Sequence, residues 1–160
     1  MFQVRYPRNK IYDESFLKIC DPKIRAFYEF YCSKKQGRSM PERKDFDPVE
    51  MKQFLPGITL VDVDQKTGEF TYRLVGTGEV TKRGNDPTGK LVRDHFRGDL
   101  WAETEENYLY VCKCKSFIFD QLDEKWDSGL QLHDEVLFMP LSNDDELVNM
   151  VMLFCVQEYK

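Results

Sequence analysis

The chain has 160 residues, a length that suits one domain with one core. Hydrophobic residues make up 41% of it and aromatic residues 14%, which favours a folded globule over a disordered chain. The net charge of −5 argues against a nucleic-acid partner, which would need a concentrated basic face. Two short basic clusters, Lys34–Lys35–Arg38 and Arg43–Lys44, are diluted by acids and predict solvated surface.

The cysteine pattern indicates free thiols. Five cysteines occur without a C-x-x-C pair, and only two histidines accompany them, so no metal site is expected. Free thiols are typical of a reducing compartment. The N-terminus has no apolar stretch of signal-peptide length, and no window approaches the ~20 apolar residues of a membrane span. We therefore expect a cytoplasmic protein without a membrane partner.

The first predicted element is a helix between Asp21, a good N-cap, and Gly37, a C-terminal stop. Four apolar residues of this segment fall at i, i+3, i+4 and i+7: Ile24, Phe27, Tyr28 and Tyr31. This stripe favours packing on the domain's own core. The alternative is that it packs on a second copy of the chain, which would make a homodimer through the N-terminal helix.

A short second helix is predicted over 48–55. Asp47 and Glu50 have capping-box spacing, and Phe46 can contact Met51 as a hydrophobic staple. Residues 58–75 then predict a β-hairpin with its turn at 65–68. In its second strand Phe70, Tyr72 and Leu74 alternate with Thr71, Arg73 and Val75, which predicts one buried face.

The region 76–98 is rich in glycine and turn residues, and a longer helix capped by Asp99 follows. Trp101, Tyr108 and Cys112 can share its inner face. The last third predicts three strands, over 115–126, 133–142 and 146–156, of which the last is apolar on both faces and should be central. The order of elements indicates an α+β domain with five antiparallel strands and helices inserted after the second strand.

The segment GNDPTGKL, residues 84–91, has the glycine and lysine spacing of a phosphate-binding P-loop. A P-loop also needs a strand that ends at its first glycine, but the predicted strand ends near Gly76. Leu91 stands where the magnesium-binding hydroxyl belongs, and Pro87 lacks a backbone N–H to cradle phosphate. ATP binding by this segment is therefore not expected.

Four ordered signatures cover residues 40–95: PERKDFDP (41–48), LPGI (55–58), YRLVGT (72–77) and GNDPTGK (84–90). Together they resemble a group of bacterial single-domain PAS proteins, of alphaproteobacterial type, once grouped as a domain of unknown function. The resemblance implies a PAS-like five-stranded sheet that cups a pocket closed by helices. It divides the chain into an N-terminal helical extension (1–40) and a PAS-like domain (41–160).

In that layout the ligand contacts would be Tyr72, Arg73, Thr77, Trp101 and Tyr108. Arg73 has two interpretations: an exposed strand arginine, or a bidentate contact for a carboxylate or phosphate if its head turns into the pocket. Asp86 and Thr88 are expected to serve as cap and turn residues rather than as ligand contacts.

PAS pockets accept haem, flavin or small metabolites, or stay empty, so the resemblance leaves the cofactor unknown. Haem would require His95 as its axial ligand. No cysteine lies in the N-C-R-F-like setting of a flavin photosensor. His95 and His133 are the only histidines, and neither has the neighbours of a catalytic triad, so we expect no enzyme activity.

The function implied is that of a stand-alone sensor or adaptor, which binds an unidentified small molecule and signals to a partner protein. The alternative is a scaffold with a filled core and no ligand, and the size of the pocket distinguishes the two. If the aromatic N-terminal helix is the signalling surface, removing residues 1–38 should abolish dimerisation or partner binding and leave the sheet folded.

Overall fold

A seven-stranded antiparallel sheet organises the chain, which a computed structural model describes over residues 3–96 and 99–160. The strands are β1 (Gln3–Arg5), β2 (Asn9–Ile11), β3 (Ile58–Val63), β4 (Phe70–Val75), β5 (Ile118–Trp126), β6 (Gln131–Leu141) and β7 (Met150–Tyr159). Their order is β1-β5-β6-β7-β3-β4, and β2 also pairs with β5. The prediction of five strands is wrong, because β1 and β2 extend the outer edge of β5.

The predicted β3–β4 hairpin and the central place of the last strand are confirmed, since β7 lies between β6 and β3. The alternation predicted for β4 fails at its end. Leu60 pairs with Leu74 but Val61 pairs with Tyr72, so Arg73 has no partner in the ladder. This β-bulge turns Val75 inward and leaves Leu74 38% exposed.

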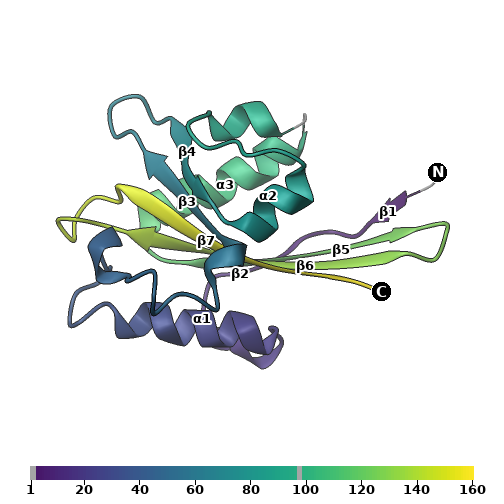
Figure 1. The fold of residues 1–160 in the computed structure, drawn as a ribbon, viewed down its shortest axis with the longest axis horizontal. Coiled ribbons are helices and arrows are strands. Elements are labelled where there is room, and N and C mark those ends of the chain that lie inside the picture. Colours follow the sequence, from purple (N-terminus) through teal and green to yellow (C-terminus); the bar gives the residue numbers. More distant parts are fainter. Residues whose placement is uncertain (1–2, 97–98) are drawn as a thin grey trace.

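Helices cover both faces of the sheet (Figure 1). The 3-10 turn η1 (Glu14–Lys18) and α1 (Pro22–Ser33) lie on one face. On the other lie α2 (Thr77–Arg83), the 3-10 turn η4 (Val92–His95) and α3 (Asp99–Cys114). The cap expected from the Asp99 side chain falls outside the described part of the chain. The β5–β6 hairpin projects past the helices, beside β1 and the C-terminus.

The aromatic stripe of α1 packs on the chain's own sheet. Its four residues are each at most 7% exposed, and the Phe27 ring lies 4.7 Å from that of Phe154 in β7. The Tyr31 hydroxyl donates to the Pro140 carbonyl at 2.5 Å. These side chains are therefore buried within one copy, which is the first interpretation of the stripe. Whether residues 1–40 form a separate extension stays a prediction.

The short helix predicted over 48–55 is instead a run of turns that ends in the 3-10 turn η3 (Leu55–Gly57). Glu50 does not complete a capping box there, because its carboxylate pairs with Lys34 of the α1 end at 2.7 Å. The Asp47 carboxylate accepts from the Val49 N–H at 2.8 Å. The expected apolar partners, Phe46 and Met51, are both buried in the α1-side core.

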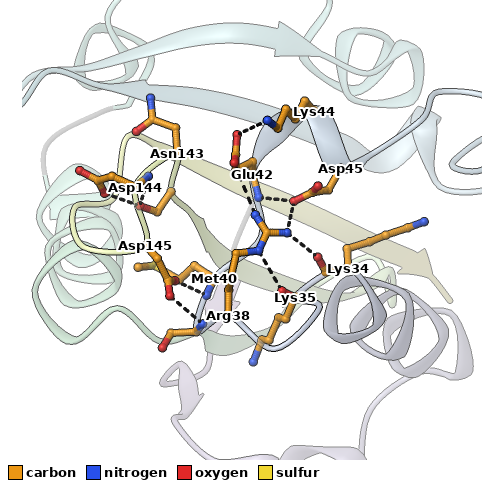
Figure 2. Close-up of polar contacts among 12 residues, drawn as sticks. Lys34, Lys35, Arg38, Met40, Glu42, Lys44, Asp45, Asn143, Asp144 and Asp145 are labelled. Atoms are coloured by element: carbon orange, nitrogen blue, oxygen red, sulfur yellow. Dashed lines mark hydrogen bonds and ion pairs between the residues drawn. The ribbon is translucent and has the colours of Figure 1, made fainter.

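Arg38 fixes the linker after α1 (Figure 2). Its guanidinium lies 2.5 Å from Asp45 of the 3-10 turn η2 (Arg43–Asp45) and 3.5 Å from Glu42. Asp145, from the β6–β7 loop, accepts from the Met40 N–H at 2.9 Å. Asp45 of the PERKDFDP signature also accepts from the Glu42 N–H at 2.7 Å, so this acid holds the backbone of the turn. Arg38 is a partly buried ion-pair partner rather than solvated surface.

The LPGI and YRLVGT signatures contact each other where η3 packs against the start of α2. The Gly76 N–H donates to the Ile58 carbonyl at 2.7 Å. A Cβ on Gly76 would collide with the Leu55 carbonyl oxygen, and one on Gly78 would lie 2.8 Å from the Pro56 carbonyl oxygen. Both glycines are required because the two backbones touch.

The GNDPTGK loop covers the free edge of β4. The Gly89 N–H donates to the Tyr72 carbonyl at 2.7 Å, and the Tyr72 N–H donates to the Lys90 carbonyl at 3.0 Å. Asp86 accepts from the Thr88 N–H at 3.0 Å and from its hydroxyl at 2.6 Å, which is the turn role expected of both. The backbone N–H groups of Thr88 and Gly89 therefore donate within the fold and are not available to bind a phosphate.

Candidate functional site

The candidate site is a cavity of about 240 Å³ between α2, α3 and the sheet. Strands β6 and β7 form its floor through Asp134, Val136, Phe138, Leu153, Cys155 and Gln157. Glu79, Lys82 and Arg83 contribute from α2, and Thr104 and Tyr108 from α3. Apolar walls with a few converging polar groups are the usual composition of a small-molecule site.

A larger hollow of about 440 Å³ lies at the projecting β5–β6 hairpin, between Tyr6 and His133. Most of its lining side chains are exposed, and Tyr6 itself is 49% exposed. It is a groove at an exposed hairpin, away from the helices. The cavity beside α2 and α3 is therefore the better candidate for ligand binding.

An acid, a thiol and an amine line one side of the cavity. The Cys155 thiol donates to Asp134 at 3.0 Å, and Lys82 Nζ lies 4.0 Å from the Cys155 sulfur. Lys82 also pairs with Glu79 at 3.0 Å. Burial raises the pKa of Asp134 and, together with Asp134 and Glu79, raises that of Cys155 well above its usual range. Cys155 is therefore a protonated thiol near neutral pH and a poor nucleophile.

Arg83 and two tyrosines form another part of the lining. Arg83 Nη1 donates to the Tyr72 hydroxyl at 3.1 Å, and the guanidinium carbon lies 5.1 Å from the centre of the Tyr72 ring. Burial raises the pKa of Tyr72, although Arg83 opposes that shift. Burial also raises the pKa of Tyr108 well above its usual range, so both phenols remain protonated.

The segment between β1 and β2 brings Arg8 to the cavity. Arg8 Nε lies 2.9 Å from Glu103 of α3, and Nη1 lies 3.2 Å from Asp120 of β5. Asp120 also accepts from the Asn107 amide at 2.7 Å. Burial raises the pKa of Asp120, while Arg8 lowers it. Arg8 thus ties this arm to both a helix and a strand of the cavity.

Of the sequence-predicted contacts, Tyr72 and Tyr108 line the cavity. Trp101 lies beside it, with its ring 5.7 Å from that of Phe96 and 6.2 Å from that of Tyr108. Thr77 is exposed at the start of α2. Arg73 is exposed at the β-bulge, where it lies 3.7 Å from Asp62, so its strand-arginine interpretation matches its position.

The residues that sequence reasoning missed are the charged ones, chiefly Glu79, Lys82, Arg83 and Asp134. A signal was present: helical spacing puts Glu79, Lys82 and Arg83 on one face, and strand alternation puts Asp134 with Val136 and Phe138. The same pattern is common on solvated surfaces, so it did not mark a cavity.

His95 does not line the cavity; its ring packs edge-on 5.8 Å from that of Tyr72. The cavity is also smaller than the ~300–1,000 Å³ typical of drug-sized ligands. These residues therefore do not fit a haem group as they are placed. Among the side chains that the structure describes, no group of three or more His, Cys, Asp or Glu could hold a metal ion.

His133 lies on the opposite face of the sheet, toward α1. Its Nδ1 is 2.6 Å from Asp123 and its Nε2 is 2.7 Å from Glu135. Because side chains alternate along a strand, Glu135 rather than Asp134 lies on the same face as the imidazole. Burial lowers the pKa of His133, but the two carboxylates raise it by more. The two carboxylates therefore favour the imidazolium form of His133.

Within the described ranges, no helix is both long and apolar enough to cross a membrane. A search of curated proteins finds none that matches the chain. The family model of the PAS domain matches residues 20–153, which includes α1 and extends into β7. This match agrees with the antiparallel sheet, the helices inserted after β4 and the cavity between them, and the chain belongs to the PAS domain family.

Proposed function

We propose that this PAS domain is a sensor that binds a small molecule in the cavity between α2, α3 and the sheet. PAS domains are sensory or interaction modules, and the observation that supports a sensor is the cavity itself. Its volume of about 240 Å³ leaves room for a compact ligand, whereas a scaffold would fill this space with rings. The ligand-free scaffold is the competing function.

The signal is proposed to leave through the N-terminal arm, residues 3–11. The stripe of α1 is buried against the sheet, so it is unavailable to a partner without unfolding that face. Arg8 both lines the cavity and pairs with Glu103 and Asp120. A ligand that moves Arg8 would therefore loosen or tighten β1 and β2 and change the surface offered to a partner protein. A homodimer is one form that this partner could take.

We propose no catalytic step for this site. The thiol that lines it, Cys155, has a raised pKa, and both histidines lie outside the cavity lining. A perturbed acid alone, Asp134, has no nucleophile to activate. Turnover of any cavity ligand, detected by mass spectrometry after long incubation, would contradict this part of the proposal.

The test is native mass spectrometry of freshly purified protein, beside a denaturing spectrum and an absorption scan. A sensor is expected to carry a non-covalent adduct that disappears on denaturation. Val136→Phe places a ring on the cavity floor and should remove the adduct. Val49→Phe, at a position 80% exposed, is the matched control and should keep it. A bare mass, together with no thermal shift from any compound in a metabolite library, would favour the scaffold.

A further inference from the structure

The basic side chains that line the cavity differ in whether they pair with a carboxylate. Arg8 pairs with Glu103 and Asp120, and Lys82 pairs with Glu79. Arg83 also lines the cavity, but none of the carboxylates that the structure describes lies within ion-pair distance of it. The lining therefore has one guanidinium left for a ligand.

Arg83 is held in place without a carboxylate partner. The Tyr72 hydroxyl accepts one of its N–H groups at 3.1 Å, and the Tyr72 ring lies beneath the guanidinium at 5.1 Å. A guanidinium has five N–H donors in a planar fork, which matches the two oxygens of a carboxylate. The hydrogen bond and the ring contact restrain the guanidinium before a ligand arrives, and that lowers the entropy cost of pairing.

The remaining lining indicates what the anion is attached to. Phe138, Leu153 and Phe96 give apolar walls, and the volume of about 240 Å³ is small. Lys82 is already paired with Glu79 at 3.0 Å, so it is not free to bind a second anionic group, and Asp134 adds another acid to the lining. A single anionic group on a compact apolar body suits this combination.

We infer that the cavity ligand is a small monocarboxylate whose carboxylate pairs with Arg83 while its apolar part contacts Phe138 and Leu153. This inference rests on the proposed sensor function and specifies its ligand class. Recognition of the acid is bidentate or charge-assisted, so a neutral analogue of the same shape binds more weakly. Arg73 has no part in it, because that side chain lies outside the cavity.

The test uses the full chain and a set of aliphatic and aromatic monocarboxylates, benzoate among them, each paired with its primary amide. Binding is measured by calorimetry and thermal shift at one ionic strength. Acids that bind should do so about tenfold more tightly than their amides, the effect expected of one charge-assisted contact. Arg83→Gln retains a donor for the Tyr72 hydroxyl and should abolish this preference without weakening the amides. Arg73→Gln, the matched control, should behave as the wild type.

The outcomes separate the two proposals. If amides bind as tightly as acids, or if Arg83→Gln binds acids like the wild type, the monocarboxylate inference is overturned while the sensor function stands. If Arg73→Gln loses the acids and Arg83→Gln does not, the wrong arginine has been assigned. If no probe binds and Val136→Phe has the same mass spectrum as the wild type, both the inference and the sensor function fail.

Discussion

Glu135 in β6 binds the first residue before α1: its Oε1 accepts a hydrogen bond from the Asp21 backbone N–H at 2.9 Å. The other oxygen of the same carboxylate lies 2.7 Å from His133 Nε2. Glu135 is 3% exposed, so this carboxylate depends on its partners for solvation. The attachment of α1 to the sheet is therefore linked to the charge of one imidazole.

The stability of the fold should fall as pH rises through the pKa of His133. This pKa is raised above 6.5 in the folded chain, because hydrogen bonds to Asp123 and Glu135 outweigh the effect of burial. A raised imidazole pKa stabilises the fold fully below the unfolded value and loses that contribution above the folded one. We expect a decrease of roughly 1 kcal/mol in the unfolding free energy over this interval, measured by urea denaturation at several pH values.

His133→Gln should be less stable than the wild type at acidic pH, and its stability should depend less on pH above the unfolded imidazole pKa of about 6.5. His95→Gln is the matched control, and its profile should keep the slope of the wild type. An unchanged slope in His133→Gln would show that His133 does not carry this dependence.

Phe27→Ala should destabilise the whole domain. Phe27 is fully buried, and its ring contacts those of Phe54 and Phe154, at 5.5 Å and 4.7 Å between centroids. Removing such a ring costs about 3–5 kcal/mol. Glu29→Ala, on the exposed side of α1, should change the free energy of unfolding by no more than about 0.5 kcal/mol. Thermal unfolding followed by circular dichroism measures both.

The same reasoning changes the expectation for removing residues 1–38. Without α1 the sheet would expose Phe154 and its buried neighbours Leu137 and Met139, so the shortened chain should aggregate or unfold. A monodisperse, folded product in size-exclusion chromatography would mean instead that α1 is a true extension of the domain.

The elements that could be predicted are those with long periodic patterns. The strands β3 and β4 are rich in strand-forming residues on either side of a turn, β4 alternates over its first four residues, and β7 is apolar on both faces. Local pattern and tertiary position agree in these strands. The strands β1 and β2 have three residues each and flank Pro7, so their pairing with β5 depends on contacts more than 100 residues away. No local pattern reports such contacts.

The aromatic residues of the candidate site could be predicted from the sequence, and the charged ones could not. Tyr72 and Tyr108 are large aromatic residues on inner faces, and packing places them at the cavity. The sequence pattern singled out Arg73 rather than Arg83, because the packing of α2 that brings Arg83 to the cavity leaves no mark in the sequence. Asp134 and Lys82 are charged residues of the kind usually found on a surface. They line one cavity because α2 packs close to the sheet.

Arg8→Gln should destabilise the fold in a pH-dependent way and release the N-terminal arm. Asp120 is 2% exposed and would lose its cationic partner, keeping only the Asn107 amide. Because Arg8 opposes the effect of burial on the pKa of Asp120, that pKa should rise further in the variant. A carboxyl with a raised folded pKa weakens the fold as pH increases from the unfolded value toward the folded one. The free energy of unfolding of Arg8→Gln should therefore be close to that of the wild type near pH 4 and about 1–3 kcal/mol lower at neutral pH.

Arg5→Gln is the control for this variant, because Arg5 pairs with Glu103, whose side chain is 44% exposed. Its free energy of unfolding should fall by less than about 1 kcal/mol at any pH. Hydrogen exchange of residues 3–11 measures the arm directly, and Arg8→Gln should exchange faster there while β6 and β7 keep their protection. A deficit that stays constant from pH 4 to pH 8 would show that Arg8 acts through the packing of its side chain. The arm would then lack the charge-based connection to the cavity on which the proposed signalling route depends.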